Sequence, residues 1–132
     1  MNAAGPFEVK LSPQPAEPGS ALGRLTIEKR YDGDLVGTSR GQMLAFQAGM
    51  KGSAGYVALE EVAGTLQGRR GTFVLQHRGA MARGLGELDV RVVPDSGTGD
   101  LVGLSGHMDI IIDGGRHSYV FDYTLNGTSP PA

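Results

Sequence analysis

The sequence predicts an all-β protein that folds as a closed, eight-stranded, antiparallel, up-and-down β-barrel. Glycine makes up 22 of the 132 residues and is scattered between short runs rich in Val, Leu and Ile, a distribution that disfavours helices. Within these runs, apolar and polar residues alternate with the period of two that is typical of half-buried strands. Short turn signals separate the runs, and closing such a meander into a barrel removes its exposed edges. We expect one domain over 1–132.

The first quarter of the chain predicts two strands and a crossing. A strand around Phe7 to Leu11 precedes the segment 12–20, "SPQPAEPGS", whose three prolines predict an extended surface crossing. In the next run, "ALGRLTIEKRY", Leu25, Ile27 and Tyr31 alternate with polar residues, and Lys29 lies on the apolar side. A second strand is therefore expected there, with one cation facing inward.

The remaining strands follow from turn signals. Asp32-Gly33 favours a tight hairpin, because both of its central residues tolerate positive φ. A third strand is expected from Asp34 to about Gln47, with a brief helical turn at Met43, Leu44 and Phe46 as an alternative. The later runs predict three further pairings, a hairpin turning at Arg69-Arg70, two strands around "PDSGTG" and a hairpin turning at Gly114-Gly115. The polar segment 126–132 is expected to be a flexible tail.

The hairpin about Arg69-Arg70 assigns side chains to the barrel interior. If these two arginines form the turn, Leu66 faces Phe73, Val62 faces His77 and Glu60 lies opposite Gly79. A turn one residue longer would break this pairing. The face that carries Glu60 and His77 is the more apolar one, so we place both residues inside as diagonal neighbours.

The last hairpin contributes aromatic residues to the same interior. With Gly114-Gly115 as the turn, Ile110 lies beside Tyr119, Met108 beside Phe121 and Gly106 beside Tyr123. Apolar walls with a few polar tips are typical of a small-molecule pocket. We therefore predict these ligand-binding residues: Tyr56, Phe73, Met108, Tyr119, Phe121 and Tyr123.

Glu60 and His77 are the candidate catalytic residues. A carboxyl group and an imidazole in a water-poor cavity can act as acid and base, because burial raises the pKa of a carboxyl group and imidazole titrates near neutrality. In the alternative interpretation, Glu60 pairs with Arg78 or solvent and His77 is a wall residue. A lumen tyrosine can polarise a carbonyl or epoxide oxygen, although buried tyrosines usually serve in packing.

The sequence predicts no metal site and no cofactor. His107, Asp109, His117 and Asp122 include ligand types, but alternation places His107 and His117 on opposite faces of the last hairpin. The glycine clusters do not match a dinucleotide fingerprint, since no helix follows them, and no nucleophile elbow is present. The chain contains no cysteine, which excludes disulfides and thiolate chemistry.

Charge and composition exclude two classes of partner and leave one open. Lys and Arg (12) nearly balance Asp and Glu (14), so neither nucleic acid nor an anionic membrane is an expected partner. The first 20 residues contain no long apolar run, and we expect a soluble, cytoplasmic protein. An outward face that carries Val57, Leu59 and Val74 would provide apolar interface area, which favours a homo-oligomer.

Several segments together resemble a widespread bacterial family of domains of unknown function. These segments are "GDLVGTSRGQML", "GSAGYVALEEVAGTLQGRRGTFVLQHRGAM", "VVPDSGTGDLVGLSG" and "HSYVFDYTL", and the resemblance extends from Phe7 to Leu125. It implies a calycin-like antiparallel barrel similar to the plant allene oxide cyclases. Related barrels include dirigent proteins and bacterial cyclases, which direct reactive intermediates into rings. None of the cyclase catalytic residues can be matched to positions in this sequence.

Three functional hypotheses follow. The first is a cofactor-independent isomerase or cyclase, in which Glu60 or His77 moves a proton and a tyrosine holds the developing oxyanion. The second is a lipocalin-like carrier or sensor that binds a small hydrophobic molecule without changing it. The third is a barrel filled by its own side chains that acts through surface contacts.

Overall fold

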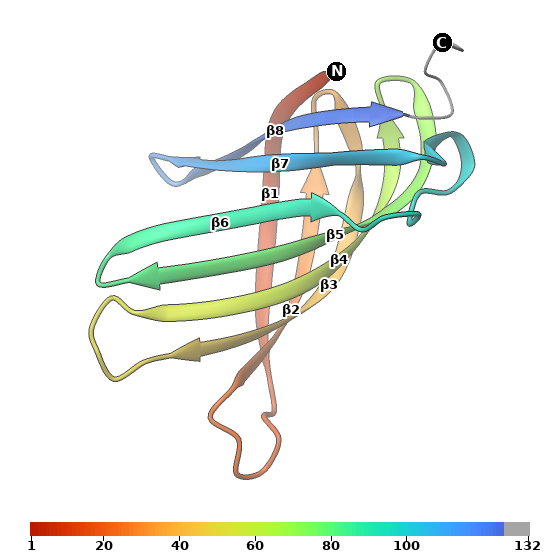
Figure 1. Cartoon of the computed structure of the whole chain (residues 1–132). Helices are drawn as coiled ribbons and strands as arrows, with labels where there is room; N and C mark the ends of the chain where they lie inside the picture. The colour runs from red at the N-terminus through yellow and green to blue at the C-terminus, as the bar shows by residue number, and fades with distance from the viewer. Residues whose placement is uncertain (126–132) are drawn as a thin grey trace.

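The computed structural model describes residues 1–125 and shows a closed antiparallel barrel in which each strand pairs with the next and β8 returns to β1 (Figure 1). One 3₁₀ turn, η1, interrupts the connection between β6 and β7. The predicted all-β, eight-stranded barrel is confirmed. The elements in chain order are β1 (Asn2–Gln14), β2 (Gly23–Tyr31), β3 (Leu35–Gln47), β4 (Ala54–Leu66), β5 (Arg69–Ala82), β6 (Leu85–Val92), η1 (Gly99–Leu101), β7 (Leu104–Asp113) and β8 (Arg116–Leu125).

Two local expectations differ from the structure. β1 continues to Gln14, so the first three residues of the expected crossing 12–20 belong to a strand. Pro13 lies opposite Leu25 near the end of this strand, where the fixed φ of proline suits extended backbone. The helical turn weighed around Met43 is wrong, because these residues continue β3 in register with β4. The segment 126–132, expected to be a flexible tail, lies outside the described residues.

The turn between β4 and β5 corrects the predicted register. It is formed by Gln67 and Gly68, both with positive φ (46° and 88°), rather than by Arg69-Arg70. Glycine adopts this conformation at no steric cost, and the turn therefore forms earlier in the chain than expected. Glu60 consequently lies opposite Leu75 instead of Gly79, a shift of four residues along β5. An even shift leaves every side chain on its predicted face, so Glu60 and His77 remain inward-facing diagonal neighbours.

The last hairpin has the predicted register. Tyr119 lies opposite Ile110, Phe121 opposite Met108 and Tyr123 opposite Gly106. Gly114 and Gly115 form the turn, with φ of 58° and 80°. The Gly-Gly pair was a sufficient signal because no other residue nearby tolerates this backbone conformation as easily.

One half of the barrel, which we call the closed half, is filled by side chains. The rings of Phe73, Phe121 and Tyr123 stack on one another, with centroid distances of 5.9 Å and 5.2 Å. Leucines from the adjoining strands and from η1 complete this half and are at most 2% exposed: Leu35, Leu66, Leu101, Leu104 and Leu125. This half lies next to the 32–34 and 67–68 turns and η1, and burial of its apolar surface is the main source of stability.

The other half, which we call the open half, lies next to the 48–53, 83–84 and 114–115 turns. Its apolar side chains face the same interior as the core residues of their strands but stay exposed, at 48% for Leu11, 45% for Met81, 46% for Leu88 and 67% for Ile112. Apolar residues at inward positions are normally buried. The interior of this half is therefore lined by apolar side chains that no other part of the described chain covers.

β6 and β7 are the most weakly paired neighbouring strands of the barrel, with a single residue pair in register. Only Arg91 and His107 are in register there, whereas every other neighbouring pair of strands shares six or more register positions. Figure 1 shows β6 and β7 close together near η1 and diverging toward their hairpin ends. We call this region the β6–β7 seam. Leu88 and Ile112 come from the two strands that flank it.

At the closed half, the backbone of β1 at Gly5 packs closely against the 32–34 turn, and the Tyr119 hydroxyl holds this turn in place. The Tyr119 hydroxyl donates to the carbonyl of Asp32 at 2.7 Å and accepts from the amide of Leu35 at 2.8 Å. A Cβ at Gly5 would lie 2.1 Å from the Asp32 carbonyl oxygen and 2.9 Å from the Tyr119 hydroxyl. Only glycine fits between these groups.

We expect Gly5→Ala to lower the free energy of unfolding by about 3 kcal/mol, because neither the turn nor Tyr119 can move without breaking these bonds. Gly49→Ala is the matched control, since a Cβ there meets nothing within 4 Å, and its effect should stay within about 0.5 kcal/mol. Urea unfolding of both variants measures the difference. Equal stabilities would contradict the close approach.

Candidate functional site

A buried ionic cluster lies between the two halves of the barrel. Its centre is Glu60 of β4, whose side chain is fully buried. Glu60 Oε1 accepts hydrogen bonds from Lys29 Nζ at 3.1 Å and His77 Nε2 at 2.8 Å, and Oε2 accepts one from Tyr31 Oη at 2.5 Å. We call these four residues the Glu60 cluster. The structure thus brings the two predicted catalytic residues into direct contact.

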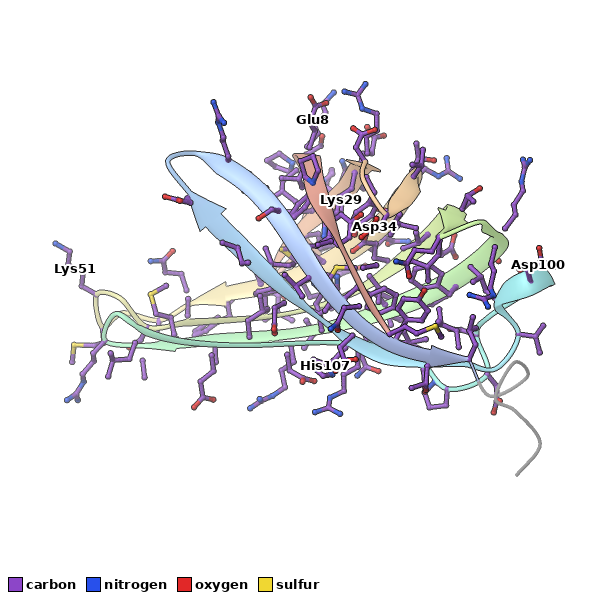
Figure 2. The ribbon with its side chains drawn as sticks, turned by 90° about the horizontal axis from the view of Figure 1, so that it is seen from above. Glu8, Lys29, Asp34, Lys51, Asp100 and His107 are labelled. Carbon is purple, nitrogen blue, oxygen red and sulfur yellow. The ribbon has the colours of Figure 1, made fainter. Side chains whose placement is uncertain are left out.

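Strand alternation places each member of the cluster inside. Lys29 on β2 is 8% exposed, as its position on the apolar side of "LTIEKRY" predicted, and Figure 2 shows it among the strands rather than at the outer surface. Its ammonium group also lies over the rings of Phe7 (4.9 Å) and Tyr31 (5.8 Å). Aromatic faces and one carboxylate therefore replace the water that a buried ammonium group loses.

The partners of Glu60 decide its charge. Burial alone would raise the pKa of this carboxyl group, but the hydrogen bond from His77, the charge of Lys29 and the hydroxyl groups of Ser39 and Tyr31 lower the pKa to about 2. The Ser39 hydroxyl lies close enough to contribute, although its geometry falls short of a hydrogen bond, and it has no partner among residues 1–125. Glu60 is therefore a carboxylate at neutral pH, and its contacts are with the cluster rather than with Arg78 or solvent.

The charge of Glu60 fixes the tautomer of His77. A carboxylate has no proton to donate, so His77 Nε2 carries the hydrogen of the 2.8 Å bond. Along β4 and β5, the pair Glu60–Leu75 lies toward the closed half and the pair Tyr56–Gly79 toward the open half, with His77 between them. The two ring nitrogens of imidazole point in roughly opposite directions. His77 Nδ1 therefore points away from Glu60, and it has no hydrogen-bond partner within the described chain.

Tyr56 is the other polar group on this side of the cluster. Its ring lies over Gly79, where an added Cβ would be 2.2 Å from ring atom Cε1, and its centroid is 6.5 Å from that of His77. Burial, and secondarily the charge of Glu60, raises the pKa of the Tyr56 hydroxyl. This hydroxyl keeps its proton at neutral pH and forms no hydrogen bond to the described residues.

The other predicted ligand-binding residues lie elsewhere. They belong to the closed half and are at most 2% exposed, so their role in binding remains a prediction: Phe73, Met108, Tyr119, Phe121 and Tyr123. His107, Asp109 and Asp122 point outward and are exposed, and His117 is half-buried against Phe7. Among residues 1–125, no group of three or more His, Asp or Glu side chains could hold a metal ion.

The sequence patterns did not predict Lys29 and Tyr31 as partners of Glu60. Alternation along β2 already placed both residues inside, which was the available signal. Their contact with Glu60 depends on how three strands are brought together: Lys29 lies opposite Ser39, and Ser39 opposite Val62. Each of these pairings is non-local.

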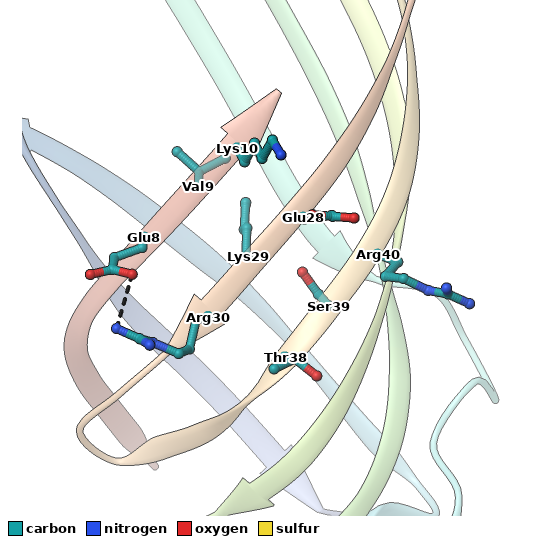
Figure 3. Close-up of a pocket in the computed structure, with 9 residues that line it drawn as sticks. All are labelled: Glu8, Val9, Lys10, Glu28, Lys29, Arg30, Thr38, Ser39 and Arg40. Carbon is teal, nitrogen blue, oxygen red and sulfur yellow. Dashed lines mark ion pairs between the residues drawn. The ribbon is translucent and has the colours of Figure 1, made fainter. Parts of the chain in front are cut away.

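Two hollows, of about 460 Å³ and 450 Å³, lie along β1 to β5. Figure 3 shows the first, where an exposed ion pair joins Glu8 and Arg30 at 2.9 Å. Most of the side chains that line the two hollows are exposed, and neither Glu60 nor His77 is among them. Lys29, a member of the Glu60 cluster, lines the first hollow, and Ser39 lines both, so the hollows border the cluster along β2 and β3.

The outer face of β4 and β5 carries the apolar residues on which the expected homo-oligomer depends. Val57 and Leu59 are 53% and 54% exposed and Val74 is half-buried, and a homo-oligomer remains a prediction. No helix in the described part of the chain is long and apolar enough to span a membrane.

The lowered pKa of Glu60 predicts a specific loss of stability in acid. A carboxyl group whose pKa falls from its usual 4.5 to about 2 on folding stabilises the native state above pH 4.5, and this contribution is lost as the pH falls toward 2. We expect roughly 3 kcal/mol of stability to disappear over this range. Glu60→Gln should remove this part of the pH dependence, as measured by urea unfolding at several pH values.

Glu61→Gln is the matched control, since Glu61 is the next residue on β4 and points outward, exposed. It should keep the pH dependence of the unsubstituted protein. A Glu60→Gln profile parallel to that of Glu61→Gln would contradict the assigned ionisation.

Comparison with known proteins places the chain in a family. The family model described as "Protein of unknown function (DUF3224)" matches residues 3–123. A crystal structure of a DUF3224 protein of unknown function from Shewanella oneidensis MR-1 is similar, with 44% sequence identity, coverage of 100% of this chain and 98% of that chain, and a TM-score of 0.91. A search of curated proteins finds no match. The chain belongs to the DUF3224 family.

Proposed function

We propose that the barrel binds a small, mainly apolar molecule in its open half. The observation that carries this proposal is the exposure, between 45% and 67%, of apolar side chains that face the barrel interior: Leu11, Met81, Leu88 and Ile112. Each exposed apolar side chain costs about 1 kcal/mol or more relative to burial. A ligand against these side chains would recover that free energy.

The polar end of the ligand would lie at the Glu60 cluster. Both oxygens of Glu60 already accept hydrogen bonds, so the carboxylate has little capacity left for a ligand. Tyr56 Oη and His77 Nδ1 are unpartnered within residues 1–125, and both residues lie on the open-half side of Glu60 along β4 and β5. Apolar walls with a few convergent polar groups are typical of ligand sites, and these two groups favour a carbonyl or hydroxyl oxygen as the polar end.

The β6–β7 seam favours ligands longer than the barrel interior. The two strands share one register pair, so their hairpin ends can separate without breaking further register pairs. Leu88 and Ile112 flank the seam on either side. A ligand chain could therefore extend between them while remaining in contact with apolar side chains.

Binding without chemistry would make the protein a carrier or sensor. Turnover by a cofactor-independent isomerase or cyclase is the second candidate, and it is favoured by one observation, the hydrogen bond between ionised Glu60 and His77. The resemblance to allene oxide cyclases supports the same candidate.

We expect the protein to bind N-phenyl-1-naphthylamine, a neutral apolar fluorophore, with an increase in fluorescence. Leu88→Glu should weaken binding at least tenfold, because it places a charge among the apolar side chains of the open half. Fluorescence titration measures the dissociation constant.

Leu59→Glu is the matched control. Leu59 is 54% exposed against 46% for Leu88 but faces outward, so its substitution should leave binding unchanged within about twofold. No saturable binding, or equal loss in both variants, would refute a site in the open half.

A further inference from the structure

We propose that His77 and Tyr56 form a proton-transfer pair that isomerises apolar β,γ-unsaturated carbonyl compounds to their conjugated α,β-unsaturated isomers. The inference rests on the proposed function, since the substrate must first bind in the open half. It assigns the base to His77 Nδ1 and the oxyanion donor to Tyr56, and it removes Glu60 from direct proton transfer.

Glu60 is unsuited to carry the proton. Its oxygens accept three hydrogen bonds, and its side chain is completely buried. A group with this many donors around it is stabilised as a carboxylate and is shielded from a ligand. Its role is to hold His77 in one orientation and one tautomer, which makes it a positioning residue.

His77 Nδ1 has the properties of a general base. Because Nε2–H is bound to Glu60, the lone pair of a neutral His77 lies on Nδ1, the nitrogen that points away from Glu60, and the His77 ring lies next to that of Tyr56. A proton taken up at Nδ1 creates a cation 2.8 Å from the Glu60 carboxylate, which stabilises it. The ammonium of Lys29, bonded to the same oxygen, offsets part of this stabilisation and so favours return of the proton.

Tyr56 supplies a hydrogen-bond donor on the same side. Its neutral hydroxyl is free of partners among residues 1–125, and its ring is held in place over Gly79. The 6.5 Å between the ring centroids of Tyr56 and His77 is short enough for one small molecule to contact both side chains. A carbonyl oxygen at Tyr56 would therefore place the adjacent carbon near His77.

The reaction is a 1,3-proton shift that needs no cofactor. His77 Nδ1 takes a proton from the carbon between the carbonyl group and the double bond, and the electrons of the broken C–H bond form a dienolate. Tyr56 Oη donates a hydrogen bond to the oxyanion that results. The protonated Nδ1 then returns the proton to the γ-carbon, which yields the conjugated isomer, restores His77 and changes no oxidation state.

The test uses 3-cyclohexen-1-one as the probe and follows its conversion to 2-cyclohexen-1-one by ultraviolet absorbance. The unsubstituted protein should accelerate the conversion above a buffer blank. His77→Gln should lower the rate at least 100-fold, and Tyr56→Phe at least tenfold. His107→Gln is the matched control, because His107 is an exposed histidine on the outward face of β7, and its rate should stay within twofold.

Each failure has a distinct meaning when displacement of N-phenyl-1-naphthylamine by the probe is measured alongside. Displacement without acceleration overturns the isomerase while leaving the binding function intact, whereas absence of fluorophore binding overturns both. A wild-type rate in His77→Gln overturns the assignment of the base. Nitrogen-15 NMR of the unsubstituted protein measures the tautomer of His77 without any variant. An Nδ1–H tautomer would also overturn the assignment of His77 Nδ1 as the base.

Discussion

The burial of one carboxylate constrains most of this structure. Glu60 lies on β4, and the groups that stabilise its charge come from β2, β3 and β5, so the ion pair and hydrogen bonds hold only when these strands keep their register. Removing a buried ion from its partners costs about 3 to 5 kcal/mol. A one-residue slip of β4 would turn Glu60 outward and leave Lys29 buried without its partner, and the cluster therefore selects one register.

The Glu60 cluster also marks the boundary between two differently built halves. On one side, aromatic and leucine side chains fill the barrel, and the Tyr119 hydroxyl and Gly5 hold the 32–34 turn against β1. On the other side, the same inward positions carry apolar residues that remain exposed, and β6 and β7 share only the pair Arg91–His107. The closed half supplies the stability that lets the open half remain uncovered and adaptable.

This division gives a physical meaning to the polar residues of the interior. Lys29 and Tyr31 saturate Glu60 from the closed side, while Tyr56 and His77 Nδ1 remain available on the open side. An ionised carboxylate that orients a histidine, next to a neutral tyrosine hydroxyl, provides one acceptor and one donor at the end of an apolar surface. The proposed ligand, apolar with one oxygen at its end, matches this arrangement.

Local patterns in the sequence determined the fold class, the inward positions of Lys29, Glu60 and His77, and the hairpin at Gly114-Gly115. These features depend on strand alternation and on glycine backbone freedom, which act over a few residues. The β4–β5 register was misassigned, because Arg69-Arg70 and Gln67-Gly68 are adjacent candidates and only the paired strands select between them. The predicted inward and outward faces of β4 and β5 are nevertheless correct, because the register differs from the predicted one by an even number of residues. Tertiary structure alone decided that Lys29 and Tyr31 meet Glu60, which inward-facing rings fill the closed half, and that β6 and β7 diverge, since each depends on contacts between strands distant in sequence.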